Sequence, residues 1–100
     1  MPNLLRNLLV VEDNDEDFVA LTRVFKSESR FAISRYHNGE EILAFLDLLQ
    51  RENPASSARS LIVLLDLNLP GMHGGEVLSR MKSMPHLKAI PVVILSQHLV

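Results

Sequence analysis

Three short apolar runs constrain the fold of this chain most strongly, because each is made of valine, isoleucine and leucine and each stops abruptly at a polar residue. The runs cover residues 8–11, 61–65 and 92–95, with Pro91 expected as the first residue of the last strand. Runs of this length and composition are typical of strands buried on both faces, as in a parallel sheet.

The segments between these runs predict helices and one further strand. A helix is expected to begin at Asn14, whose side chain can cap its first turn, and two more are expected over 40–51 and 75–84. Residues 31–36 alternate weakly and predict a strand, and 53–60 have the small polar side chains of a loop. Strands that alternate with helices predict an α/β fold with a parallel sheet, right-handed crossovers and helices on both faces.

The composition bounds the functions that the chain can have. Its 100 residues suit one domain, 1–100, and the apolar fraction of 47% indicates a folded core. Lys and Arg total 10 against 12 Asp and Glu, so we expect no direct nucleic-acid binding. The absence of cysteine excludes disulfides and thiolate metal ligands. No apolar run is long enough for a membrane and no signal peptide is evident, so we expect a cytoplasmic protein.

Polar side chains follow three of the four predicted strands. Glu12 and Asp13 end the first strand, Asp66 ends the third with Asn68 just after it, and Ser96 ends the fourth. In an open parallel sheet, ligands bind beyond the carboxyl ends of the strands, near the point where the strand order reverses. We therefore expect these groups to converge at one edge of the sheet.

Three carboxylates at one place repel each other unless a proton or a cation sits among them. Without cysteine or paired histidines, the ligands are hard oxygens, which favour Mg²⁺, Mn²⁺ or Ca²⁺ over zinc. The small number of protein oxygens fits Mg²⁺, which keeps several waters, better than it fits a Ca²⁺ cage.

Each of these acids also has a purely structural interpretation. Asp15, Glu16 and Asp17 are best explained as favourable charges at a helix start. Glu12 and Asp13, taken alone, fit a helix start and a binding site equally well. Asp66 interrupts an apolar run, where a carboxylate is costly unless something compensates it, so we interpret it as a site residue.

Three motifs resemble the receiver domain of bacterial response regulators, in the CheY-like superfamily. They are LLVVEDND at 8–15, LLDLNLPGMHGG at 64–75 and IPVVILS at 90–96. The resemblance covers essentially the whole chain and implies a flavodoxin-like, doubly wound sheet. It is greatest for single-domain regulators paired with phytochrome-type histidine kinases, so it implies a sensor histidine kinase as partner.

The resemblance also implies a role for each residue of the cluster. In the family, the acids matching Glu12 and Asp13 bind Mg²⁺, and the acid matching Asp66 accepts the phosphoryl group and also binds the metal. The residue matching Asn68 offers its backbone carbonyl to the metal, and the hydroxyl matching Ser96 hydrogen-bonds the phosphoryl group and helps to switch the domain. Such a protein is a phosphoacceptor that assists its own modification rather than an ordinary enzyme.

The chain departs from the family pattern at two places. His73 stands where the family usually has an acid, and we expect a small effect there. The family continues beyond a fourth strand with a helix, a fifth strand carrying a lysine, an aromatic switch residue and a last helix. We therefore expect a fold truncated after its fourth strand, with an exposed edge that makes the chain a homodimer through residues 90–100.

Two other functions compete with phosphoacceptance. A receiver fold that has lost its switch could serve as an interaction or dimerisation module. A phosphohydrolase acting through an aspartyl phosphate would need a second acid two residues after Asp66, and Asn68 stands there instead.

Overall fold

A computed structural model describes residues 6–26, 30–52, 61–67, 69 and 71–95 of the chain. Helices and strands alternate along these residues as the sequence predicts. The elements in chain order are β1 (Arg6–Val11), α1 (Asp15–Lys26), β2 (Phe31–Tyr36), α2 (Gly39–Glu52), β3 (Leu61–Asp66), α3 (Gly74–Ser83) and β4 (Val92–Leu95).

The four strands form one parallel sheet in the order β2-β1-β3-β4. Val10 on β1 lies opposite Arg35 on β2 and Leu64 on β3. The chain runs from β1 outward to β2 and then returns to β3 on the other side of β1, so the strand order reverses between β1 and β3. A crevice for a ligand is expected at the carboxyl end of these two strands.

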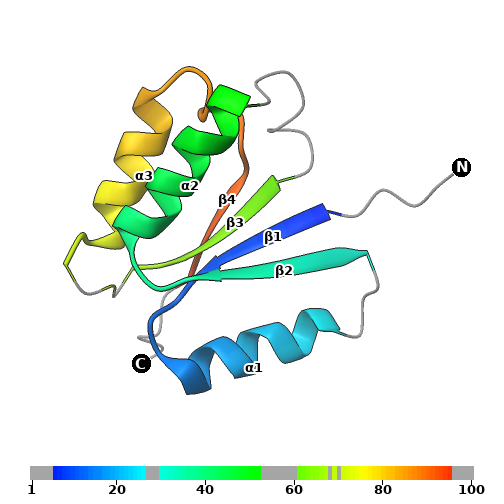
Figure 1. The fold of residues 1–100 in the computed structure, drawn as a ribbon. Coiled ribbons are helices and arrows are strands. Elements are labelled where there is room, and N and C mark those ends of the chain that lie inside the picture. Colours follow the sequence, from blue (N-terminus) through cyan, green and yellow to red (C-terminus); the bar gives the residue numbers. More distant parts are fainter. Residues whose placement is uncertain (1–5, 27–29, 53–60, 68, 70, 96–100) are drawn as a thin grey trace, which may run out of the picture.

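Helices cover both faces of the sheet. Figure 1 shows α1 on one face and α2 with α3 on the other. On β1, Leu9 and Val11 join the core that includes α2 and α3, whereas Leu8 and Val10 join the core that includes residues of α1. All four side chains are at most 1% exposed, which confirms a strand buried on both faces. Each such side chain contributes about 1.5–3 kcal/mol to folding by leaving water.

A side-chain acceptor caps the beginning of each helix. Asn14 Oδ1 accepts the Asp17 N–H at 2.9 Å before α1, and Asn38 Oδ1 accepts the Glu41 N–H at 2.8 Å at the start of α2. His73 Nδ1 accepts the Gly75 N–H at 3.0 Å and caps α3. These caps satisfy backbone donors that have no partner within the helix.

The predicted doubly wound α/β sheet is confirmed, with small differences at the ends of elements. β1 begins two residues earlier than expected, and β3 includes Asp66 as its last residue. Pro91, expected inside the last strand, precedes it; its carbonyl still accepts the Val63 N–H at 3.0 Å, but a proline has no N–H of its own to donate. None of the described helices has the length and hydropathy that crossing a membrane would require.

Candidate functional site

The carboxyl groups of Glu12, Asp13 and Asp66 lie together at the carboxyl ends of β1 and β3. One oxygen from each is within 4.8 Å of the others. The expected convergence is therefore confirmed for these three residues. It arises because β1 and β3 are parallel neighbours that end at the same level, with Val11 opposite Leu65.

Glu12 and Asp66 are buried, and each is only 1% exposed. Glu12 Oε2 accepts the Asn14 N–H at 3.3 Å, whereas Oε1 is buried without a hydrogen-bond donor among the described residues. The Asp66 carboxyl group lies within hydrogen-bonding reach of Glu12. Two facing acceptors in a buried place need a proton or a cation between them.

The surroundings of Glu12 favour its neutral form. Burial raises the pKa of the Glu12 carboxyl from 4.5 to about 7, and the neighbouring Asp66 adds to this rise. The Asn14 N–H opposes it, because it stabilises the ionised carboxylate. Without a metal, Glu12 therefore takes up a proton close to neutral pH.

Asp13 differs from the other two acids because it is exposed to solvent. Its side chain forms no hydrogen bond or ion pair with any residue that the structure describes. The position of its carboxylate therefore depends on the backbone between β1 and α1. Asn68 and Ser96, the other predicted site residues, lie outside the described residues.

Gly74 brings the start of α3 against the end of β3. A Cβ atom at Gly74 would lie 2.5 Å from the Asp66 carbonyl oxygen and 2.7 Å from Leu67 Cα, so only glycine fits without a backbone shift. The Gly74 N–H donates to the Leu67 carbonyl at 3.3 Å, which closes the loop after Asp66. Gly74 was not among the residues predicted from the sequence, although the adjacent glycines 74 and 75 are a signal of close approach.

Arg35 is a second residue near the site that was not predicted from the sequence. Its Nε donates to the Glu12 carbonyl at 3.1 Å, and Nη1 pairs with Asp15 Oδ1 at 2.8 Å. The signal was present in the sequence, because Arg35 continues the alternating apolar positions Phe31 and Ile33 on β2. A charge in such a place requires nearby partners.

One known protein family matches nearly all of this chain. The family described as the response regulator receiver domain matches residues 8–99. The chain belongs to this family. Receiver domains of two-component response regulators are in general signalling modules rather than enzymes.

This receiver domain is similar to other response regulators, one of which is described as a phytochrome response regulator. It is 38% identical to response regulator Rcp1 of Synechocystis sp. over 90 residues, which are 89% of this chain and 60% of Rcp1. The crystal structure of the phosphorylated cyanobacterial phytochrome response regulator RcpA is also similar, with a TM-score of 0.79 and 35% identity over 96% of this chain and 68% of that chain. The chain thus spans well under the full length of either relative.

The acidic cluster has the composition of a divalent-cation site. Receiver domains bind Mg²⁺ or Mn²⁺ in an acidic pocket. A Mn²⁺-bound structure of Rcp1 has a TM-score of 0.71 to this chain and 33% identity, over 95% of this chain and 68% of that one. The buried acceptor Glu12 Oε1, beside the Asp66 carboxyl group, is an atom that a cation would satisfy. The residues present therefore fit such an ion.

Proposed function

We propose that Asp66 accepts a phosphoryl group from a sensor histidine kinase in a Mg²⁺-dependent reaction, and that the modified domain relays the signal by a change in conformation or association. The observation that carries this proposal is the cluster of Glu12, Asp13 and Asp66 at the switch point of the sheet. A buried nucleophile beside two further acids is the arrangement that phosphoacceptance requires.

In the proposed reaction, an Asp66 carboxylate oxygen attacks the phosphorus atom of a phosphohistidine on the kinase. The new O–P bond makes an acyl phosphate, the N–P bond breaks, and the histidine nitrogen leaves with the electron pair and takes up a proton. β3 holds Asp66 at its end with its backbone fixed against Gly74. Holding the nucleophile in one place lowers the entropic cost of the transfer.

Glu12, Asp13 and Asp66 would hold the Mg²⁺ ion, with the Asn68 backbone carbonyl as a further ligand. The bound ion would neutralise charge on the transferring phosphoryl group. Ser96 would donate a hydrogen bond to a phosphoryl oxygen. The roles of Asn68 and Ser96 come from the family resemblance alone.

The similarity to RcpA and Rcp1 supports a phytochrome-type histidine kinase as the partner. Because such a kinase presents its phosphohistidine inside the cell, the proposed place of action is the cytoplasm. A net charge of −2 and the absence of a basic surplus support a protein partner rather than nucleic acid.

The test is phosphorylation by acetyl phosphate, followed by intact-mass spectrometry. The wild-type protein should gain one phosphoryl group in Mg²⁺ and none in a chelator, and Asp66→Ala should gain none. Asp47→Ala is the matched control, because Asp47 is a half-exposed acid on α2 that pairs with Arg51 and lies outside the cluster. An adduct that survives in Asp66→Ala would refute the assignment, and a wild type that gains none would favour an interaction module.

A further inference from the structure

The Arg35 side chain contacts the residue that follows β1 and two residues in the first part of α1. Its Nε binds the Glu12 carbonyl at 3.1 Å, and its Nη1 binds the Asp15 carboxylate at 2.8 Å. Its guanidinium carbon lies 4.7 Å from the centroid of the Phe18 ring. Two of these contacts fall immediately before and shortly after Asp13, whose side chain has no hydrogen bond or ion pair within the described part of the chain.

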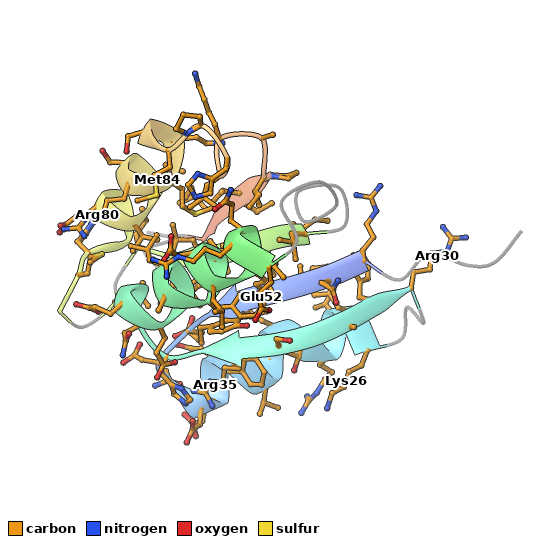
Figure 2. The ribbon with its side chains drawn as sticks, turned by 45° about the horizontal axis from the view of Figure 1, so that its top comes forward. Lys26, Arg30, Arg35, Glu52, Arg80 and Met84 are labelled. Carbon is orange, nitrogen blue, oxygen red and sulfur yellow. The ribbon has the colours of Figure 1, made fainter. Side chains whose placement is uncertain are left out.

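The place of Arg35 follows from the alternation of β2. Phe31 and Ile33 face the core that includes residues of α1, and Arg35 is the next residue on that side. Figure 2 shows Arg35 at the end of the sheet where α1 begins. Its side chain is 19% exposed, so most of the group is enclosed, whereas its partner Asp15 is 87% exposed. An enclosed guanidinium stacked on an aromatic ring has little freedom to move.

The exposed ion pair with Asp15 contributes little stability by itself, because water screens it. The hydrogen bond from Nε to the Glu12 carbonyl is different, since it links the backbone directly before Asp13 to the neighbouring strand β2. The Glu12 N–H also donates to the Tyr36 carbonyl at 2.9 Å, so two links from the end of β2 hold this residue.

We propose that Arg35 is a positioning residue for the metal site: it fixes residues 12–15 so that the Asp13 carboxylate, which has no hydrogen bond or ion pair with any described residue, stays beside Glu12 and Asp66. The inference rests on the proposed function, because it assigns Arg35 a role in binding the Mg²⁺ ion. Arg35 binds no metal itself. Its positive charge repels a nearby cation, so any gain in metal affinity from this residue must come from the geometry that it imposes on Asp13.

Electrostatic repulsion and positioning therefore predict opposite changes in Mg²⁺ affinity for the same substitution of Arg35. Removing the charge in Arg35→Met should tighten Mg²⁺ binding if electrostatics alone mattered. Positioning predicts weaker binding, by about tenfold or more, as when a group that orients a metal ligand is removed. Arg35→Lys keeps the charge and most of the stem but cannot donate to both acceptors with a planar fork, so it should also bind Mg²⁺ more weakly.

The experiment is calorimetric titration of Mg²⁺ into the wild type, Arg35→Met and Arg35→Lys, with amide hydrogen exchange of residues 13–18 measured without metal. Arg80→Met is the matched control, because Arg80 forms an exposed ion pair with Glu76 at 2.9 Å on α3. We expect a raised Kd and faster exchange in both Arg35 variants, and wild-type values in Arg80→Met.

An unchanged or lowered Kd in Arg35→Met would overturn the inference, as would an equal loss in Arg80→Met. A wild-type protein that binds no Mg²⁺ would instead refute the proposed function. The positioning of residues 12–15 would then be decided by the exchange measurement alone, and unchanged exchange in Arg35→Met would overturn it.

Discussion

The buried carboxyl groups of Glu12 and Asp66 face each other at the ends of two neighbouring parallel strands. Each side chain is 1% exposed, and Glu12 Oε1 has no donor among the described residues. A protein gains nothing in stability from placing two acids in this way, since their mutual repulsion and desolvation both oppose folding. The arrangement is favourable only with a proton or a cation between them, and this requirement leads to the first two predictions.

The stability of the metal-free domain should fall as the pH rises from about 4.5 to about 7. Over this range the native state binds a proton on Glu12, whose pKa is raised to about 7, while the unfolded chain, with its ordinary pKa of 4.5, does not. The proton on Glu12 therefore stabilises the native state fully below about pH 4.5, and this stabilisation is lost as the pH rises to about 7. The contribution from Glu12 amounts to about 3 kcal/mol at most, and urea unfolding at a series of pH values measures it.

Glu12→Gln isolates this contribution, because glutamine keeps the shape and stays neutral. The variant should be more stable than the wild type at pH 8 and similar to it near pH 4.5. Parallel stability curves for the two proteins would contradict a raised pKa at Glu12.

Mg²⁺ should stabilise the domain without any phosphoryl donor. A cation that binds only the native state at 100 times its Kd adds about 2.7 kcal/mol, which is roughly 10–20 °C in Tm for a domain of this size. Asp13→Asn and Asp66→Asn should both weaken this effect and both raise the metal-free Tm, because each removes a repelling charge. Thermal melts with and without Mg²⁺ measure this, and metal-free melts that fall in both variants would argue against a repulsive cluster.

Gly74→Ala should destabilise the domain by about 1–3 kcal/mol and slow phosphorylation by acetyl phosphate. The added Cβ would lie 2.5 Å from the Asp66 carbonyl oxygen, so the backbone that carries the nucleophile must move. Gly75→Ala is the control, because its Cβ would lie 3.3 Å from a side-chain atom, His73 Nδ1, which can shift. Equal effects of the two substitutions on Tm and on phosphorylation rate would rule out the close approach as the cause.

A polypeptide of these 100 residues should self-associate through β4. No described residue pairs with the side of β4 opposite β3, and Val93 and Ile94 are 46% and 37% exposed. An open apolar strand edge is a template for pairing with another chain. Light scattering should show a dimer or larger species that Ile94→Lys reduces, whereas Val24→Lys, at an exposed valine on α1, should not reduce it. A stable wild-type monomer at high micromolar concentration would contradict this prediction.

Much of the site could be predicted because it depends on local pattern. The apolar runs identify the strands, and an acid directly after a strand must lie near its carboxyl end. For Glu12, Asp13 and Asp66 this placed three side chains at one edge of the sheet without knowledge of any contact. The same reasoning could not identify Gly74. This position requires glycine because a side chain would clash with the Asp66 carbonyl oxygen, and the two approach each other only in the folded protein.

The sequence by itself determined the order of the elements, the parallel sheet and the acids at the strand ends, since hydrophobic periodicity and the direction of parallel strands are properties of short segments. The tertiary structure alone decided that Arg35 binds the Glu12 carbonyl, 23 residues away in the chain, and that burial beside Asp66 raises the pKa of Glu12. Desolvation and Coulomb interactions depend on distance in space. That distance is determined by side-chain packing and not by separation along the chain.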